Sequence, residues 1–357
     1  MIVCAQQDRL LSAKPSFTVR RLPLNAVDGL DNNPDDLNAG DVVLARVDAV
    51  GHHQNLERPD GRRAALFEGD EILVACGARY APDQFESAVP EALGPADLVA
   101  AGGIAGIELQ RHERMKAPTQ INLLGRLVDG DQRPINLSHL AIPPKQGPSR
   151  LTTIAVAGTS MNAGKTHTVA SIVRGFSRVG ARVAALKVTG TGAGGDLWMM
   201  RDAGAKLVLD FTDVGFATTY QAPLAALEQG VVTLLSEAVA RQCDVAIIEI
   251  ADGLKQAETA ALLQSPVIQR RLCGMVFAAN DAMGAESGVH WLRRANHKVL
   301  AISGQLTRSP LAIREATSAI DVPCLTPKEL ASGGGPAKLL PSFRRSRRGE
   351  APAEIAA

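Results

Sequence analysis

A glycine-rich segment, GTSMNAGKT at residues 158–166, lies between the apolar run LTTIAVA and a stretch with helical spacing. The apolar run predicts a buried strand, and Val169, Ile172 and Val173 follow at the spacing of a helix that packs on a sheet. A tight glycine turn between a strand and a helix directs backbone amides and the positive helix end toward an anion. The segment therefore predicts an α/β fold with a phosphate-binding loop.

The lysine and threonine that end this segment complete the phosphate-binding pattern. Lys165 is expected to reach the β and γ phosphates of a nucleotide, and Thr166 is expected to hold Mg²⁺. The nucleotide-binding residues predicted for this region are Gly158, Thr159, Asn162, Ala163, Gly164, Lys165, Thr166 and His167. The alternative is a glycine turn with a surface lysine and no ligand, and His167 is also interpretable as a plain surface residue.

From Leu151 onward, apolar strands alternate with amphipathic helices. We expect strands at residues 151–157, 182–188, 206–211, 243–250, 273–279 and 298–303, and helices at 166–179, 223–241, 286–296 and 310–319. Continuous apolar strands with helices between them indicate a mainly parallel, doubly wound sheet that is covered on both faces. Ligands of such sheets bind outside the carboxyl ends of the strands.

The region before this sheet has a different pattern, with short β-rich runs at residues 42–47, 64–67 and 71–76. Turn signals such as Pro59-Asp60-Gly61 separate the runs and predict antiparallel hairpins in a small barrel or sandwich, with one more hairpin at 129–131. The Pro/Gly stretch at 141–150 predicts a linker. We expect a β-rich domain over 1–143, a linker over 144–150, a P-loop domain over 151–335 and a disordered tail over 336–357.

Composition narrows the choice of partners and compartment. The formal net charge is +1 and aromatic residues make up 3 %, so the chain has neither the field nor the stacking platforms expected for nucleic-acid or membrane binding. The five scattered cysteines show no zinc spacing and predict free thiols in a reducing compartment. With no basic leader before an apolar core and no run long enough to span a membrane, a cytoplasmic location is the expectation.

A second lysine stands where a strand meets a glycine-rich loop, in AALKVTGTGAGGD at residues 184–196. Lys187 would lie in the ligand crevice beside the phosphate loop, where an ammonium suits a transferring phosphoryl group or a carboxylate. We predict substrate contacts by Lys187, Thr189, Gly190 and Thr191, and we take Asp196 as a further candidate metal ligand. The alternative is a solvated lysine at the end of a strand in a flexible loop.

Polar residues also end two later strands. Glu249 follows an apolar run and is the predicted Mg²⁺ ligand, and Asp252 is a predicted substrate contact. Asn280 follows the next strand and is predicted to contact the nucleotide base, although an Asn-Asp pair is also a common turn starter. Residues 303–310 are an equally supported candidate for closing over the base.

A further polar stretch lies between these motifs, at residues 207–220. Asp210 and Asp213 are candidate ligands for a cation or an amine, and the candidate substrate contacts of this stretch are Thr218, Thr219 and Tyr220. The alternative is that the two aspartates are cap or turn residues.

The loop resembles that of dethiobiotin synthetases, which has the form Gly-Thr-Asp-x-x-Val-Gly-Lys-Thr with the same five residues between its glycines. The resemblance covers about half of the chain, residues 151 to about 330, and extends to cobyrinate amidases and MobB nucleotide-binding proteins. It implies a P-loop fold in which ATP and Mg²⁺ activate a small acid by phosphoryl transfer. It also implies that Lys187 holds substrate and transferred phosphate, and that Glu249 holds Mg²⁺. Ser160 and Val188 replace the usual Asp and Pro, so the substrate is not implied.

Two alternatives remain open at this stage. The two-domain layout is similar to the family of domain of unknown function 1611, which includes D-glutamate N-acetyltransferases, and this resemblance implies acyl transfer from acetyl-CoA to an amino acid. A nucleotide-dependent accessory or switch protein is the third hypothesis. Our prediction is a kinase- or ligase-type enzyme that uses ATP and Mg²⁺ and acts on a small acid or an amino acid. The front domain would contribute to the acceptor site or to an oligomer contact.

Overall fold

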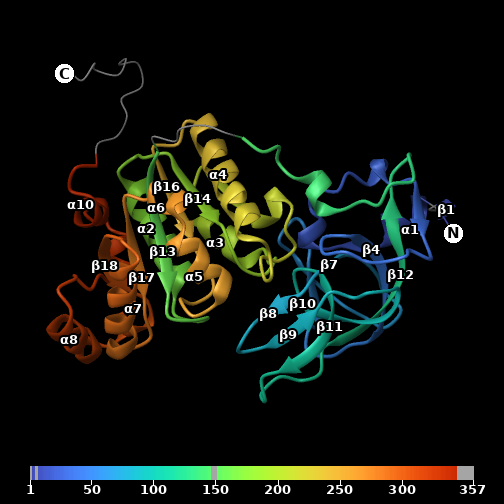
Figure 1. Cartoon of the computed structure of the whole chain (residues 1–357), viewed down its shortest axis with the longest axis horizontal. Coiled ribbons are helices and arrows are strands. Elements are labelled where there is room, and N and C mark those ends of the chain that lie inside the picture. Colours follow the sequence, from blue (N-terminus) through green and yellow to red (C-terminus); the bar gives the residue numbers. More distant parts are fainter. Residues whose placement is uncertain (1, 5–6, 146–150, 344–357) are drawn as a thin grey trace.

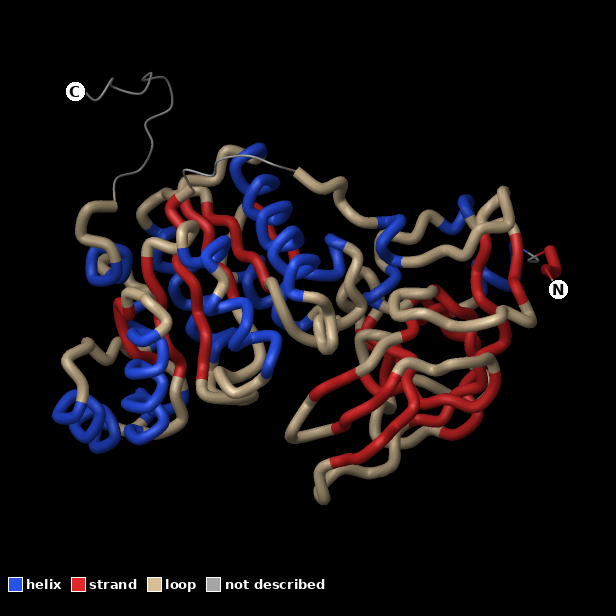
Figure 2. The backbone as a smooth tube through the Cα atoms, in the orientation of Figure 1, coloured by secondary structure: helices blue, strands red, loops and turns tan. Residues whose placement is uncertain are grey.

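The structure, a computed structural model, describes residues 2–4, 7–145 and 151–343 of the chain. Figure 1 shows two halves side by side, a strand-rich half in blue and teal and an α/β half in green to red. Figure 2 shows that the longer helices belong to the second half. None of the helices in these ranges has the length and apolarity to cross a membrane.

The N-terminal half is built on a ten-stranded mixed sheet with the order β1-β3-β12-β4-β7-β11-β9-β8, joined by β10 and β2. The strands are β1 (Ile2–Cys4), β2 (Lys14–Pro15), β3 (Gly29–Asp31), β4 (Val42–Ala49), β7 (Glu71–Cys76), β8 (Arg79–Tyr80), β9 (Phe85–Ala88), β10 (Gly94–Ala100), β11 (Ile104–Arg111) and β12 (Thr119–Val128), with a separate hairpin of β5 (Asn55–Glu57) and β6 (Arg63–Ala65). Short helical segments accompany them: α1 (Gln7–Ser12), η1 (Phe17–Val19), η2 (Leu24–Ala26) and η3 (Leu137–Leu140).

The three expected strand runs are present in this half, and the expected turn at Pro59-Asp60-Gly61 joins β5 to β6 in an antiparallel hairpin, whereas β7 also has parallel neighbours. Strand β4 pairs with β7 antiparallel, whereas β2 and β11 both pair with β7 parallel. The expected antiparallel pairing is therefore present, and parallel pairing, which the sequence does not predict, occurs beside it. Strand β7 is buried almost along its whole length, because apolar clusters cover both of its faces. A fully buried strand reads as a continuous apolar run, which carries no information about the direction of its neighbours.

His53, a buried histidine in this half, is expected to make the free energy of unfolding depend on pH. Burial and the charge of Arg79 lower the pKa of His53 to about 4, from its usual value of 6.5. The unfolded chain therefore binds more protons between these values, so the free energy of unfolding is highest above pH 6.5 and falls as the pH falls toward 4. We expect His53→Gln to remove about 2 kcal/mol of the stability difference between pH 7.5 and pH 5 in urea unfolding.

The matched control for this prediction is His139→Gln, because His139 is exposed on η3. The control is expected to keep the pH dependence of the wild type. An unchanged pH dependence in His53→Gln would contradict the assignment of the effect to this imidazole.

The C-terminal half is a six-stranded sheet with the order β15-β14-β16-β13-β17-β18, and every recorded pairing in it is parallel. Its strands are β13 (Thr152–Gly158), β14 (Val183–Lys187), β15 (Leu207–Asp210), β16 (Val245–Glu249), β17 (Gly274–Ala278) and β18 (Val299–Ser303). Its helical elements are α2 (Lys165–Arg178), α3 (Gly195–Asp202), η4 (Phe211–Val214), α4 (Leu224–Ala240), α5 (Ala257–Gln264), α6 (Pro266–Gln269), α7 (Ala282–Arg294), η5 (Gln305–Arg308), α8 (Pro310–Ala319), α9 (Pro327–Leu330) and α10 (Gly335–Leu339). Two separate apolar clusters cover its two faces, as expected for an α/β fold.

The long periodic elements of this sheet confirm the expected strands and helices, whereas several short elements were not predicted. Helix α3 begins inside the segment interpreted as a loop, and α5, α6, α9 and α10 have no counterpart in the prediction. The expected disordered tail is wrong for its first residues, because α10 packs on α2 and the ring of Phe343 lies 4.9 Å from that of Phe176. Residues 344–357, and residues 146–150 of the expected linker, lie outside the described residues.

The two halves are packed directly on each other. The backbone amide of Gly194 donates to Glu57 Oε2 at 2.7 Å, and the Tyr220 hydroxyl donates to Glu86 at 3.2 Å. A Cβ atom on Gly102 would lie 1.9 Å from the carbonyl oxygen of Gly192, so only glycine permits this approach of the two backbones. The interface places part of the N-terminal half next to the carboxyl ends of β14 and β16.

Asp210 and Asp213 belong to this interface. Their carboxylates accept from Arg20 at 3.0 Å and 2.7 Å, and Asp210 also caps η4. Neither residue lines the cavity described below. The interpretation of these two aspartates as ligands for a cation or an amine is therefore corrected, and the cap interpretation is confirmed.

Candidate functional site

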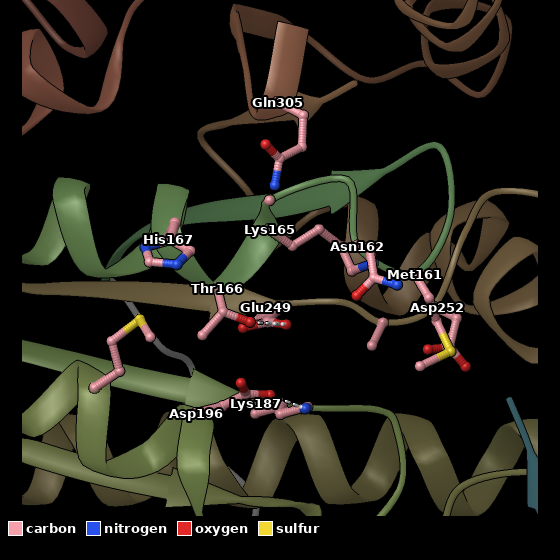
Figure 3. Close-up of a pocket in the computed structure, with 13 residues that line it drawn as sticks. Met161, Asn162, Lys165, Thr166, His167, Lys187, Asp196, Glu249, Asp252 and Gln305 are labelled. Atoms are coloured by element: carbon pink, nitrogen blue, oxygen red, sulfur yellow. Dashed lines mark hydrogen bonds and ion pairs between the residues drawn. The ribbon is translucent and has the colours of Figure 1, made fainter. Parts of the chain in front are cut away.

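A cavity of about 420 Å³ opens at the carboxyl ends of the parallel strands (Figure 3). Strands β14, β16 and β13 lie next to one another, with Lys187 in register with Glu249 and Glu249 in register with Val156. This register brings the ends of three strands to the same edge. The cavity is lined by Met161, Asn162, Gly164, Lys165, Thr166, His167, Lys187, Asp196, Met199, Glu249, Ala251, Asp252 and Gln305.

The loop between β13 and α2 has the conformation required of a phosphate-binding loop. Asn162 and Gly164 have φ angles of 61° and 92°, and α2 begins directly afterwards at Lys165. Left-handed backbone at two positions turns the chain sharply and directs the first amides of the helix toward the cavity. The loop and the helix start are therefore in place to receive an anion.

Lys165 is buried, and its ammonium group donates to the carbonyl oxygen of Ser160 at 2.8 Å. Burial lowers the pKa of Lys165 from its usual value, while the carboxylates of Glu249 and Asp252 act in the opposite direction. The Lys165 side chain thus folds back along the loop, toward the part of the cavity that the amino end of α2 faces. A cation at this position can neutralise charge on a phosphoryl group.

Thr166 and Glu249 form the second part of the site. The Thr166 hydroxyl donates to Glu249 Oε1 at 3.2 Å, and Figure 3 shows the two side chains pointing toward each other. Burial, reinforced by the charge of Asp196, raises the pKa of Glu249 to about 7. Its other oxygen, Oε2, is buried and has no hydrogen-bond partner among the described residues.

This donor set fits Mg²⁺, because a hydroxyl and a carboxylate with an unused oxygen are the hard oxygen ligands that this ion prefers. Within residues 2–4, 7–145 and 151–343, no group of three or more His, Cys, Asp or Glu side chains could hold a metal ion alone. A cation here would therefore depend on phosphate oxygens and water for its remaining ligands, which is the usual situation for Mg²⁺ in phosphate-transfer sites.

The third part of the site is an ion pair between Lys187 and Asp196, from the end of β14 and the first turn of α3. Burial opposes the positive charge of Lys187, but Asp196 and Glu249 outweigh it and raise the pKa of the lysine. Lys187 is therefore held as an ammonium on the wall of the cavity. Asp196, the weaker metal candidate, is engaged by this lysine and lines the same cavity.

The remaining predicted substrate contacts divide into two groups. Asp252 lines the cavity, whereas Thr189, Gly190 and Thr191 are absent from its lining. The Thr189 hydroxyl donates to the Ala251 carbonyl, and the Gly190 amide donates to Thr219 Oγ1 at 2.8 Å. These contacts hold the loop after β14 against the neighbouring segments at Ala251 and Thr219. In this structure, Thr189 and Gly190 therefore stabilise the loop and do not line the cavity.

The predicted base contact, Asn280, is exposed and lies outside the cavity lining, with its amide 3.4 Å from Ser160 Oγ. The segment at residues 303–310 also contacts the phosphate loop, because the backbone amide of Gln305 donates to the Ala163 carbonyl at 3.0 Å. Together with α2 it borders a second hollow of about 260 Å³, which shares three lining residues with the first cavity. The lining of this second hollow is Gly164, His167, Thr168, Gly304, Gln305, Arg308 and Pro327.

Several lining residues were not among the predicted site residues. Met199 lies one turn after Asp196 on α3 and therefore faces the same side of that helix. A sequence analysis that recognised α3 would have predicted it. Gln305 falls in the segment considered for the base, and Met161 lies inside the phosphate loop itself. Asp83, which bonds to Asn162, comes from the other half of the molecule and carries no local signal.

No family model and no curated protein matches this chain. The solved structures similar to it include the signal recognition particle receptor FtsY from Elizabethkingia anophelis, with 15 % identity, a TM-score of 0.35, and coverage of 54 % of this chain and 67 % of that chain. FtsY from Mycoplasma mycoides has 18 % identity, a TM-score of 0.34, and coverage of 52 % and 61 %. The signal recognition particle 54 kDa protein from Aeropyrum pernix K1, in complex with GDP, has 15 % identity, a TM-score of 0.35, and coverage of 55 % and 47 %.

This chain thus spans about half to two thirds of the length of these neighbours, and at such scores the likeness says nothing about function. The assignment of the fold depends on the site itself. A parallel strand, a left-handed turn at Gly164, a buried Lys165 and a Thr166 beside the Glu249 carboxylate stand in the order that phosphate binding requires. The C-terminal half of the chain therefore has the strand, loop and helix geometry of a phosphate-binding loop on a parallel sheet.

Proposed function

We propose that the chain is a Mg²⁺-dependent enzyme that uses ATP to phosphorylate a small acid, in the manner of a kinase or ligase. The observation that carries the proposal is the second buried lysine in the cavity. Binding and hydrolysing a nucleotide require Lys165 and Thr166, whereas Lys187 adds an ammonium that Asp196 keeps charged on the opposite wall. Such a group suits the carboxylate of a second ligand.

Different residues of the cavity would bind the phosphates, the metal ion and the acceptor acid in this reaction. The loop amides and Lys165 would hold the phosphates, with Lys165 neutralising the charge that develops on the transferred group. Thr166 and Glu249 would hold Mg²⁺, which supplies further charge neutralisation when bound. Lys187 would orient the acceptor acid, and Asp252 would complete its site. Positioning and charge stabilisation are the main contributions that this chemistry needs from a protein.

A nucleotide-dependent switch is the second candidate, and one observation favours it. The side-chain amide of Asn162, in the phosphate loop, donates a hydrogen bond to Asp83 of the N-terminal half at 2.6 Å. A conformational change of the loop would therefore alter a contact between the two halves. A switch would hydrolyse the nucleotide slowly and would require no small acid. Acyl transfer from acetyl-CoA is less well supported, because a CoA site has no need of both Thr166 and Glu249 as metal ligands.

Isothermal titration of the full chain tests the proposal, with non-hydrolysable ATP and GTP analogues plus Mg²⁺ and, separately, with acetyl-CoA. We expect the ATP analogue to bind, and we expect ATP consumption to increase when a screen of small carboxylic and amino acids supplies the acceptor. Binding and slow hydrolysis that no acid accelerates would favour the switch. Binding of acetyl-CoA alone would overturn the proposal in favour of acyl transfer.

A further inference from the structure

The N-terminal half reaches the phosphate loop through the turn between β8 and β9. Residues 81–84 close this turn, with the Ala81 and Gln84 amides donating to the carbonyls of Phe85 and Ala81. At its tip, Asp83 Oδ2 accepts a hydrogen bond from the Asn162 side-chain amide at 2.6 Å. In Figure 1 the β8–β9 hairpin extends from the strand-rich half toward the α/β half. The contact therefore links the two halves at the phosphate loop itself.

The residue that Asp83 contacts is in the left-handed backbone conformation, which asparagine adopts more readily than most residues other than glycine. Asn162 has a φ angle of 61°, and this left-handed geometry costs free energy unless neighbouring contacts stabilise it. A further contact is made by the backbone amide of Gln305, which donates to the Ala163 carbonyl at 3.0 Å. Asp83 and Gln305, from distant parts of the chain, thus contact successive residues of the loop.

A carboxylate beside an anion-binding loop would repel phosphate unless its charge were compensated. Arg79 of the same hairpin is 6 % exposed, and its guanidinium donates to the Val99 carbonyl and to Gln84 Oε1. Burial lowers the pKa of Arg79 to about 10, and the charges of Asp83 and Asp252 act to raise it. Arg79 therefore remains a cation near Asp83 and offsets the negative charge that the hairpin brings to the loop.

The second oxygen of the Asp83 carboxylate makes no hydrogen bond with the residues that the structure describes that would hold the side chain. Oδ1 is buried and has no hydrogen-bond partner in the described part of the chain. A buried, unpaired carboxylate oxygen is unfavourable, so the position of Asp83 is maintained by the bond to Asn162 and by the field of Arg79.

We propose that Asp83 is a positioning residue of the phosphate loop, which holds Asn162 in its left-handed conformation and makes the N-terminal half part of the anion site. The inference uses the proposed function only in taking a nucleotide as the ligand of the loop. Removing Asp83 leaves Asn162 without its side-chain acceptor, so the loop samples other backbone conformations and binds phosphate less well. Asp83→Asn keeps an oxygen acceptor at the same distance and should retain most of the effect.

The first experiment needs no nucleotide. Hydrogen exchange of the loop peptide over residues 158–164 is measured in the full-length wild type, Asp83→Ala, Asp83→Asn and the control Glu86→Ala. The control removes the bond to Tyr220 from the same hairpin, so it weakens the interface at a site away from the loop. We expect faster exchange in Asp83→Ala, near-wild-type exchange in Asp83→Asn, and no change in the loop of Glu86→Ala. Equal exchange in all four proteins would overturn the inference.

The second experiment measures the affinity of the same proteins for an ATP analogue with Mg²⁺. We expect Asp83→Ala to bind about tenfold more weakly, equivalent to about 1.4 kcal/mol. Asn162→Ala should weaken binding similarly, with little further loss in the double variant, because both substitutions break the same contact. Additive losses, or equal weakening by Glu86→Ala, would overturn the inference. A wild type that binds no nucleotide would refute the proposed function alone, and the exchange experiment would then decide the role of Asp83.

Discussion

Replacing Lys165 with alanine is expected to abolish turnover and to weaken nucleotide binding in a chain that remains folded. The ammonium of Lys165 is buried at the loop and donates to the Ser160 carbonyl, so it is already directed along the loop that receives the phosphates. Removing one preorganised donor to developing charge typically costs about 10²- to 10³-fold in rate. Steady-state rates of nucleotide hydrolysis, with and without acceptor acids, measure the loss.

The matched control for this variant is Lys298→Ala. Lys298 is exposed and directly precedes β18, at the amino end of the parallel sheet and away from the cavity. We expect wild-type rates from the control and native circular dichroism spectra from both variants. Wild-type turnover in a folded Lys165→Ala protein would refute the assignment of the phosphate-binding loop.

Glu249→Gln is expected to remove the Mg²⁺ dependence of nucleotide binding and to lower turnover by about 10²-fold or more. Glutamine keeps the shape of the side chain and can still accept from the Thr166 hydroxyl, but it lacks the anionic oxygen that a divalent cation requires. Titration with the ATP analogue across a range of Mg²⁺ concentrations measures the effect. Affinity without Mg²⁺ should change little, because the loop and Lys165 are intact.

The same substitution has a consequence for stability without metal. The raised pKa of Glu249, about 7, means that the folded chain binds more protons than the unfolded chain between the ordinary carboxyl value and pH 7. This contribution is present at low pH and is lost as the pH rises through 7. In metal-free urea unfolding we therefore expect Glu249→Gln to be more stable than the wild type at pH 8, but not at pH 4.

The control for both measurements is Glu315→Gln, because Glu315 is exposed on α8. It should retain the Mg²⁺ dependence and the pH dependence of the wild type. A Glu249→Gln protein with normal Mg²⁺ dependence would exclude Glu249 as the metal ligand.

The central part of the site follows from the sequence because its members are close along the chain or stand at strand ends. The loop GTSMNAGKT is a local motif, so the positions of Lys165 and Thr166 follow from nine consecutive residues. Lys187 and Glu249 each end an apolar run, and parallel strands place their carboxyl ends at one edge. Local periodicity and the rule for parallel sheets are therefore sufficient to predict that these four side chains lie close together.

Other features depend on contacts that no local pattern carries. Helix α3 is short and weakly amphipathic, so the glycine-rich segment before it was interpreted as a loop. Thr189 and Thr191 resemble ligand-binding residues in the sequence, whereas in the fold Thr189 bonds to a neighbouring loop and Thr191 pairs with Thr218. Asp210 likewise caps η4 and forms an ion pair with Arg20. The ion pair could not be predicted, because Arg20 is 190 residues away along the chain.

By itself, the sequence determined the parallel sheet, the phosphate loop and the residue types at the strand ends, because hydrophobic periodicity and the spacing of glycine, lysine and threonine are properties of short segments. Only the tertiary structure decided that Thr189 and Thr191 lie outside the cavity lining, that Asp196 holds Lys187, and that Asp83 bonds to Asn162. The Lys187–Asp196 pair requires the turn into α3, and the Asp83–Asn162 bond joins residues that are 79 positions apart along the chain. Packing of the two halves, rather than any motif, therefore places the N-terminal half at the phosphate loop.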